Sequence, residues 1–316
     1  MRDSSAVKLE CGELMEKRQD GRLSAVKMNW RYGTEFLRRM DRNSMSCLLL
    51  SIFFVFSPIF FYGNVSASLP NEISKLRLAA EKGSADAQFR LGGVYYSGEG
   101  VNRNYTEAVK WAHLAAEQGH MKAQYNLGEM YYTGKGVDRN YNEAVRWYRC
   151  AALQGLAAAQ FNIGVCYATG LGVAHNDEEA LRWYRLAASQ GDTKSQFNIG
   201  VCYATGLGVA HNDEEALRWY RLAASKGHIM AQNNLGVMYA LGKGVTRNFT
   251  EAEKWYRLAA AQGNVKAQLS LGLIYEKGYG VAKNSAESIK WYRLAAYQGN
   301  AAAQNKLLVK SSSDHQ

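Results

Sequence analysis

This chain of 316 residues contains little proline and little cysteine: 2 prolines and 5 cysteines, against 30 glycines. An odd number of cysteines, with no Cys-x-x-Cys pair, argues against a disulfide framework and against a structural zinc site. Few prolines beside many glycines is unusual for a loop-rich protein and favours helices joined by repeated glycine turns. Because 47% of the residues are hydrophobic, the chain has enough apolar surface to bury a core.

The chain also lacks a large excess of charge of one sign. Its net charge is +10, and residues 1–67 hold ten Lys or Arg and seven Asp or Glu, which leaves +7 for residues 68–316. A surplus of this size attracts acidic partners or membrane surfaces only weakly. Because no basic patch is interleaved with aromatic residues, we expect no nucleic-acid partner.

One apolar run stands out, and it is too short to cross a bilayer as a helix. It covers residues 47–61, 15 in all, and contains Pro58, whereas a spanning helix needs about 20 residues. Basic residues precede it, at Arg38, Arg39 and Arg42. The small residues Val65 and Ala67 follow it. This order is that of a secretory signal, and it predicts cleavage after Ala67.

The leader is longer than an ordinary signal needs, so an internal start at Met28, Met40 or Met45 is the simpler interpretation. We expect residues 1–45 to be a polar leader outside the mature protein and residues 46–67 to hold the signal's hydrophobic region and cleavage site. The alternative is an uncleaved membrane anchor. The predicted location is the periplasm or the extracellular space in a bacterium, or the endoplasmic reticulum and secretory pathway in a eukaryote.

The rest of the chain repeats itself every 36 residues without an insertion. Six tryptophans mark the period, at Trp111, Trp147, Trp183, Trp219, Trp255 and Trp291. The repeats are residues 85–120, 121–156, 157–192, 193–228, 229–264 and 265–300. Residues 160–189 and 196–225 are identical over 30 positions, which indicates a recent duplication.

Each unit predicts two helices joined by a glycine turn, as residues 157–192 illustrate. A first helix, helix A, is expected over 157–169, with a glycine in its middle that permits close helix contact. Residues 170–172, Gly-Leu-Gly, turn the chain. Asn176 then caps helix B, and Glu179 is placed to reach back to it in a capping box. Gly191 ends helix B.

The repeated residues resemble a known family. The order Leu-Gly-x-x-Tyr-x-x-Gly-x-Gly-Val, then Asn-x-x-Glu-Ala-x-x-Trp-Tyr-x-x-Ala-Ala-x-x-Gly, is similar to the Sel-one-like repeat, a relative of tetratricopeptide repeats. The resemblance covers residues 85–300 and implies an all-α fold, a right-handed α-solenoid of six helix-turn-helix repeats. Residues 68–84 are expected to end in a capping helix B. Residues 301–316 are expected to hold a capping helix A and a disordered tail from Ser311.

The same resemblance implies a binding face on helix A, because in tetratricopeptide relatives an Asn before the Leu-Gly pair contacts bound peptide. One amide per repeat could pair with an extended peptide backbone, and its neighbours could take side chains. The alternative is that these amides are only tolerated surface residues or bond a neighbouring helix. The candidate peptide-binding residues are Asn126, Asn162, Asn198, Asn234, Glu129, Met130, Thr133, Thr169 and Thr205.

Helix B carries a row of basic residues that we interpret as a solvated, ion-paired face. Glu143–Arg146, Glu178–Arg182 and Glu214–Arg218 have the spacing and order of helical ion pairs. Cys166 and Cys202 occupy equivalent positions of helix A, where small semi-buried side chains are favoured over reactive thiols.

Metal and catalytic sites are not predicted. His175 and His211 lie beside acidic residues in equivalent loops, but the other four repeats have no histidine there, so we expect loop residues and no metal. Some proteins of this family have been described as β-lactamase-like, yet the Ser-x-x-Lys element occurs only at Ser5–Lys8 and Ser24–Lys27, in the leader. We therefore predict no catalytic residue and no cofactor. The expected function is a monomeric, exported scaffold for a peptide or protein partner, with a β-lactamase-like or cell-wall-directed hydrolase as the alternative.

Overall fold

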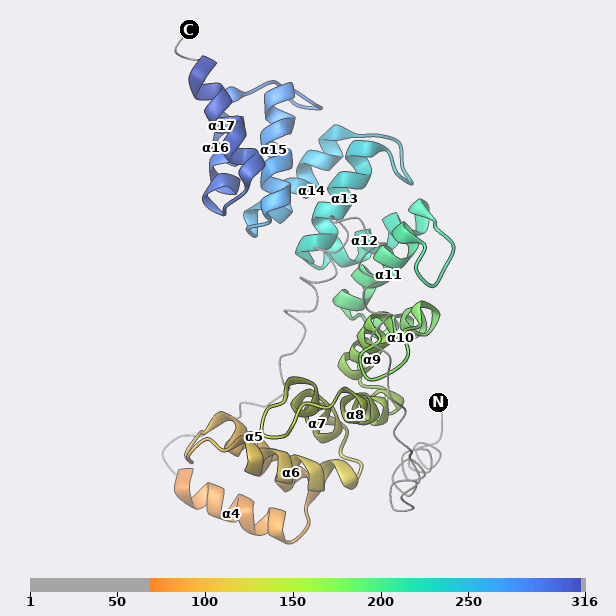
Figure 1. The fold of residues 1–316 in the computed structure, drawn as a ribbon, viewed down its shortest axis with the longest axis vertical. Helices are drawn as coiled ribbons and strands as arrows, with labels where there is room; N and C mark the ends of the chain where they lie inside the picture. The colour runs from red at the N-terminus through yellow and green to blue at the C-terminus, as the bar shows by residue number, and fades with distance from the viewer. Residues whose placement is uncertain (1–68, 314–316) are drawn as a thin grey trace. The chain divides into compact units, whose positions relative to one another are not determined.

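The computed structural model describes residues 69–313, which form fourteen helices of 13 residues each and no strand (Figure 1). The helices are α4 (Leu69–Glu81), α5 (Ala85–Ser97), α6 (Tyr105–Glu117), α7 (Met121–Thr133), α8 (Tyr141–Leu153), α9 (Ala157–Thr169), α10 (Asp177–Ser189), α11 (Thr193–Thr205), α12 (Asp213–Ser225), α13 (Ile229–Leu241), α14 (Phe249–Ala261), α15 (Val265–Lys277), α16 (Ser285–Tyr297) and α17 (Ala301–Ser313). The predicted leader and export signal, residues 1–67, lie outside the described part. Within 69–313, no helix has both the length and the apolar character that a bilayer crossing requires.

The helices alternate as the repeat predicts, with helix A and helix B of each unit following in turn. The helix expected over residues 157–169 is α9, with the same bounds. Before the first repeat, α4 lies at the position of a helix B, and after the last, α17 lies at that of a helix A. The prediction of a disordered tail from Ser311 is wrong in part, since α17 continues to Ser313.

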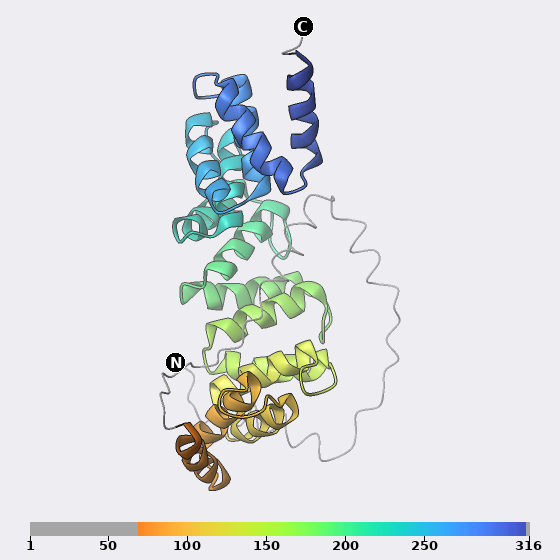
Figure 2. The same ribbon diagram turned by 90° about the vertical axis from the view of Figure 1, so that its left-hand side faces the viewer.

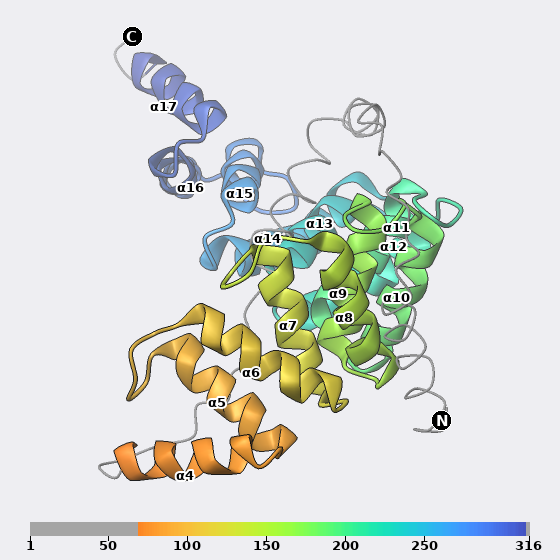
Figure 3. The ribbon, with the colours of Figure 1, turned by 60° about the horizontal axis from the view of Figure 1, so that its bottom comes forward.

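The chain divides into two compact units after Asn176, and the division falls inside the third repeat, between its two helices. In the first unit, α5 packs on α6 and α7 on α8, while α4, α6 and α8 each pack on the helix A that follows. In the second unit, α11, α13 and α15 pair with α12, α14 and α16 in the same way (Figure 2). There α17 packs on α16 (Figure 3).

Glycine in the middle of helix A brings the two helices of a repeat into close contact, as the sequence predicts. A Cβ atom on Gly200 of α11 would lie 2.6 Å from ring atoms of Tyr220 on α12. The same clash with a helix B tyrosine would arise at Gly128, Gly236 and Gly272. Glycine therefore lets the tyrosine ring pack directly on the helix A backbone, which offsets its cost of about 1 kcal/mol in a helix interior.

The core of each repeat is completed by the next helix A. In the second unit, Ala223 and Ala224 of α12 are buried against Ala231 and Leu235 of α13. Small side chains at this point of helix B allow the following helix to approach. The Ala-Ala pair therefore has the packing role that the sequence assigns to it.

The glycine turn also packs on the preceding repeat. Gly134 ends α7 with a positive φ of 75°, and its N–H donates to the carbonyl of Met130. Gly136, with a φ of 75°, lies so close to the start of α6 that a Cβ would be 2.2 Å from the carbonyl oxygen of Tyr105. The second glycine of the turn is therefore required both for its backbone conformation and for contact with the neighbouring repeat.

A buried glutamine in helix A connects three successive helices, and the sequence did not predict this contact. In α13, Nε2 of Gln232 donates to the carbonyl of Ala224 at the end of α12, at 3.2 Å. Its Oε1 accepts from Nε2 of Gln262, just after α14, at 2.8 Å. The same carbonyl also accepts from the backbone N–H of Gly227 at 3.0 Å, so the glutamine supplies its second hydrogen bond. The same pairs occur at Gln88–Gln118, Gln124–Gln154 and Gln268–Gln298.

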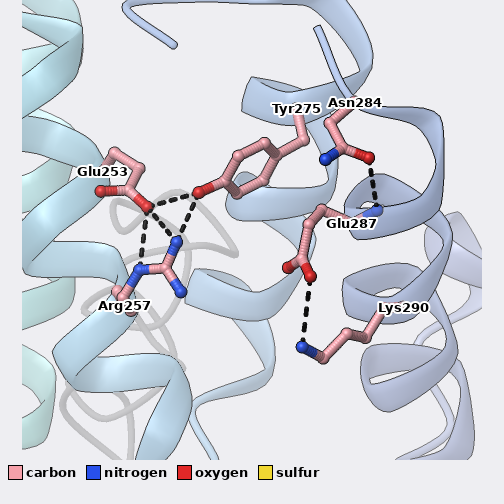
Figure 4. Close-up of polar contacts among 6 residues, drawn as sticks. All are labelled: Glu253, Arg257, Tyr275, Asn284, Glu287 and Lys290. Atoms are coloured by element: carbon pink, nitrogen blue, oxygen red, sulfur yellow. Dashed lines mark hydrogen bonds and ion pairs between the residues drawn. The ribbon is translucent and has the colours of Figure 1, made fainter. Parts of the chain in front are cut away.

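The Asn-x-x-Glu motif caps helix B, but only half of the expected capping box forms. Oδ1 of Asn284 accepts from the backbone N–H of Glu287 at 3.0 Å (Figure 4). The N–H of Asn284 donates to the carbonyl of Tyr275 instead of to the glutamate. The carboxylate of Glu287 forms an ion pair with Lys290, with Oε1 of the glutamate 3.3 Å from Nζ of the lysine. Asparagine caps the start of α6, α8, α12 and α14 in the same way.

Two helices A are capped by histidine. Nδ1 of His228 accepts from the N–H of Ala231 at 3.2 Å, and its ring stacks on Phe197 with the centroids 4.6 Å apart. His120 caps α7 and stacks on Phe89 in the same arrangement. Only a neutral imidazole can accept this bond. Burial lowers the pKa of His228 to about 4, while Asp192 acts to raise it and Lys194 to lower it.

We expect Gln232→Leu to destabilise the fold by about 1–3 kcal/mol, because it removes two hydrogen bonds of a buried side chain, one to the carbonyl of Ala224 and one from the amide of Gln262. Urea unfolding followed by circular dichroism measures the change. Gln262→Lys is the matched control, since Lys226 holds the equivalent position in the fourth repeat and donates to the carbonyl of Gly191. Equal unfolding midpoints for wild type and Gln232→Leu would show that the glutamine pair contributes no stability.

The histidine cap predicts a loss of stability in acid. The folded-state pKa of His228 lies below the unfolded value of about 6.5, so the folded state binds fewer protons. Its stabilisation is therefore complete above pH 6.5 and is lost as the pH falls toward 4. His228→Asn keeps the cap without the titration, as Asn264 does at the equivalent position. In urea unfolding, we expect the two proteins to agree at pH 7 and the wild type to be less stable at pH 4 by about 1–3 kcal/mol. A constant difference at all pH values would contradict the prediction.

Candidate functional site on the A helices

The candidate residues occupy fixed positions of helix A, and we call this set the A row. They stand at the sixth position in the second to fifth repeats, at the ninth and tenth positions in the second repeat, and at the thirteenth position in the second, third and fourth. The row is not uniform. In the first unit, Asn126 of α7 and Asn162 of α9 are each only 1% exposed. In the second unit, Asn198 of α11 and Asn234 of α13 are half-buried. The same amide position is thus closed in one unit and accessible in the other.

In the first unit, Glu129 is the centre of a buried polar cluster. The hydroxyl of Tyr148 on α8 donates to its Oε1 at 2.6 Å, and Nδ2 of Asn162 on α9 donates to the same oxygen at 2.8 Å. Glu129 is 4% exposed. Burial raises the pKa of Tyr148 well above its usual value, and the neighbouring carboxylate raises it further. The carboxylate therefore joins three successive helices, α7, α8 and α9.

Two amides of this cluster have unused hydrogen-bonding capacity. Both amide atoms of Asn126, and Oδ1 of Asn162, are buried without a hydrogen-bond partner among the described residues. A buried amide without its hydrogen bonds costs about 1–3 kcal/mol. Asn126 lies three residues before Glu129 on the same helix, and Asn162 is bonded to the carboxylate of Glu129. We call Asn126, Glu129, Tyr148 and Asn162 the Glu129 cluster.

The remaining A-row residues of α7, α9 and α11 pack in the core or bond to their own helix. Met130 is buried against Ala108 and Ala112 of the preceding helix B, so it is a core residue and is not available to a bound peptide. The threonine hydroxyls donate to the carbonyl four residues earlier in their own helix, at 2.7–2.8 Å. These bonds are Thr133 to Glu129, Thr169 to Val165 and Thr205 to Val201.

Accessible apolar residues lie beside the amides in the second unit. Val201 and Val237 are half-buried three residues after Asn198 and Asn234. Leu241 at the end of α13 is 61% exposed and Leu273 on α15 is 40% exposed. Sequence reasoning missed both leucines. Leu241 occupies the helix A position of Thr169 and Thr205, so an apolar residue there was a readable signal.

The thiols of the A helices are buried and protonated at neutral pH. Burial raises the pKa of Cys166 to about 12, with a further contribution from Glu129. Burial likewise raises the pKa of Cys202 to about 12, with Asp177 next in importance. The thiolate is the reactive form of cysteine, so neither side chain has the properties of a nucleophile.

The basic row of helix B is partly structural. Arg149, Arg185 and Arg221 each donate to the tyrosine hydroxyl of the next helix A, at Tyr167, Tyr203 and Tyr239, with distances of 2.7, 3.0 and 2.8 Å. Arg257 donates to Tyr275 in the same way, and both donate to Glu253 (Figure 4). Arginine thus bonds one repeat to the next, which the interpretation as a solvated face did not include.

One of the three predicted helix B ion pairs forms as expected, and in the other two the arginine pairs with the next glutamate along the chain. Glu143 pairs with Arg146 at 3.3 Å, as expected. Arg182 and Arg218 pair with Glu179 and Glu215, three residues before them, instead of with Glu178 and Glu214. In the helix, the residue three positions away lies nearer to the arginine, and such exposed pairs contribute little stability.

The loop histidines do not assemble a metal site in the described chain. Nε2 of His211 lies 3.3 Å from Oδ1 of Asp213, a contact between a loop residue and the first residue of α12. Between residues 69 and 313, no group of three or more His, Cys, Asp or Glu side chains is arranged to hold a metal ion.

Similar proteins share both the sequence pattern and the fold. The chain is similar to the crystal structure of c5321, a protective antigen of uropathogenic Escherichia coli strains with an SLR fold, at 36% identity and a TM-score of 0.74, over 88% of this chain and 58% of that one. It is also similar to the crystal structure of a Sel1 repeat protein from Oxalobacter formigenes, at 36% identity and a TM-score of 0.62, over 73% and 97% of the two chains. This chain therefore spans 58% of the length of the E. coli structure. None of the curated proteins matches it.

The family model of the Sel1 repeat matches all six repeats, at residues 85–120, 122–156, 157–192, 193–228, 229–264 and 265–300. These matches cover well over half of the chain. Together with the helices of the described part, they confirm the predicted class of fold, an all-α solenoid of helix-turn-helix repeats. Such a repeat fold is a scaffold suited to protein interaction. The chain belongs to the Sel1 repeat family.

Proposed function

We propose that this protein is a non-catalytic scaffold that binds an extended segment of a partner protein along the A helices of its second unit. The observation that carries the proposal lies in the second unit, where Asn198 and Asn234 recur at one repeat position and are half-buried. Half-buried amides hold donors and acceptors within reach of a peptide backbone, and the exposed Leu241 and Leu273 offer contacts for its side chains. The fourth and fifth repeats each provide one such amide.

The same proposal includes an exported location and a monomeric state. Support for export comes from the signal pattern that ends at Ala67, and from similarity to an E. coli protein that is a protective antigen. A monomeric state is supported by α4 and α17, which add one helix beyond the first and the last repeat.

The alternative hydrolase has little support. Its Ser-x-x-Lys elements, Ser5–Lys8 and Ser24–Lys27, lie outside the described residues. The thiols of α9 and α11 are protonated at neutral pH, since burial raises the pKa of Cys166 and Cys202 to about 12. We therefore expect no saturable turnover of a chromogenic β-lactam by the full chain.

We expect Asn198→Ala combined with Asn234→Ala to weaken peptide binding about 10- to 100-fold, because each amide bond to a peptide contributes about 1 kcal/mol or more. The probe is a pool of nonapeptides of random sequence, and the full chain is immobilised. The readout is the fraction of the peptides that the immobilised chain retains. Because neither Asn198 nor Asn234 is fully buried, we expect the double variant to fold.

The matched control is Arg182→Ala combined with Arg218→Ala, which truncates two side chains that are 72% exposed on helix B of the same unit. It should retain the wild-type peptides. Equal losses in both double variants, or saturable β-lactam turnover that a single Ser→Ala change removes, would count against the proposed function.

A further inference from the structure

The exposed stripe of α15 has a lysine at each end. Lys266, Ser270, Leu273 and Lys277 follow one another at intervals of four, three and four residues, which places them on one face of the helix. Ser270 is half-buried and the other three are exposed, so this face is directed away from the core. Between the two lysines it offers an exposed leucine and no carboxylate.

The stripe at the same positions of α13 is apolar apart from one amide. It consists of Met230, Asn234, Val237 and Leu241, all of them half-buried or exposed. The two helices contact each other directly. Nδ2 of Asn264, the N-cap of α15, donates to Sδ of Met230 at 3.4 Å. The two stripes therefore adjoin, and together we call them the α13–α15 face.

The positive charge on the A helices of the second unit is not balanced. Together, α11, α13 and α15 hold three lysines and one carboxylate, that of Glu276. This carboxylate accepts from the hydroxyl of Tyr292 at 2.6 Å and from Nζ of Lys306 at 3.2 Å, and Nζ of Lys277 lies 3.7 Å from it. One carboxylate shared by two lysines leaves a positive charge. Lys266 is exposed and forms no ion pair in the described part of the chain.

The lysines on helix B of the same unit are neutralised locally. Nζ of Lys254 lies 2.5 Å from Oε1 of Glu251, and Nζ of Lys290 lies 3.3 Å from Oε1 of Glu287. A carboxylate of a partner that approaches these lysines meets a carboxylate already there. At Lys266 it meets none, so the α13–α15 face is the better match for an acidic group.

We propose that the segment bound by the A helices of the second unit is acidic as well as apolar, with Asp or Glu side chains that pair with Lys266 and Lys277. This inference rests on the proposed function, because it assigns the chemical class of the bound segment. Apolar side chains of the segment pack on Leu241 and Leu273, and its carboxylates pair with the lysines. Charge complementarity of this kind contributes to specificity more than to affinity. The expected effect is therefore a choice among segments that all bind.

The test compares three pools of nonapeptides that share a central Leu and carry one fixed residue on each side of it, both Glu, both Gln or both Lys. The other positions hold random uncharged residues, and both ends are blocked, so that only side chains carry charge. We expect the immobilised full chain to retain the Glu pool about 3- to 10-fold more strongly than the Gln pool, as for two exposed ion pairs. The Lys pool should be retained least. At 1 M salt, where the Debye length is about 3 Å, the preference should disappear.

Variants of the lysines show whether this face is responsible. Lys266→Gln combined with Lys277→Gln should remove the preference for the Glu pool and leave the retention of the Gln pool unchanged. Lys266→Glu combined with Lys277→Glu should reverse the preference, so that the Lys pool is retained most. The matched control is Lys254→Gln combined with Lys290→Gln, which removes the same charge from helix B lysines that are 60% and 61% exposed. It should keep the wild-type preference.

Three results would overturn the inference. The first is equal retention of the Glu and Gln pools by the wild type at low salt. The second is a preference that the helix B control removes as fully as the change of Lys266 and Lys277. The third is lysine-dependent co-sedimentation with phosphatidylglycerol vesicles without a preference among the pools, which would assign the face to a membrane surface. Failure to retain any pool would instead contradict the proposed function itself.

Discussion

Direct contact between the backbone of helix A and a tyrosine ring of helix B is the constraint on which the rest of the structure depends. At Gly200 there is no room for a Cβ beside Tyr220. This contact sets the spacing of the two helices, and the spacing places Ala223 and Ala224 where the next helix A can approach. One helix pair cannot bury its apolar face alone, so each repeat is stabilised by packing against its neighbour.

The polar residues that recur in the repeats serve the backbone and the joints between helices. Buried glutamines bond to carbonyls near the ends of helices, asparagines cap helix B, and arginines bond to the tyrosine of the next helix A. Each of these groups would be costly to leave without a partner. The repeats differ at other positions, and the second repeat alone has a charged residue, Glu129, at the ninth position of helix A.

The fold could be predicted almost completely because its signals are local and repeated. The glycine turns, the Asn caps and the helical face around the Leu-Gly pair each specify one element, and six copies remove the ambiguity of one. The binding face could be predicted only as a row. Spacing places Asn126 and Asn234 on the same face of a helix, but their exposure depends on neighbouring helices, so one is buried and the other half-buried. Met130 failed as a site residue for the same reason.

By itself, the sequence determined the period, the bounds of the helices and the glycine that brings them together, because these follow from interactions within one repeat. Only the tertiary structure decided which polar residues meet. The bond from Gln262 to Gln232, and the bonds from Tyr148 and Asn162 to Glu129, join residues from different helices. Their distances depend on how the helices stack, and a periodic pattern carries no information on that stacking. Scarce proline and abundant glycine thus describe how the helices of this solenoid are connected. Its buried polar interactions depend instead on contacts between helices that the sequence pattern does not specify.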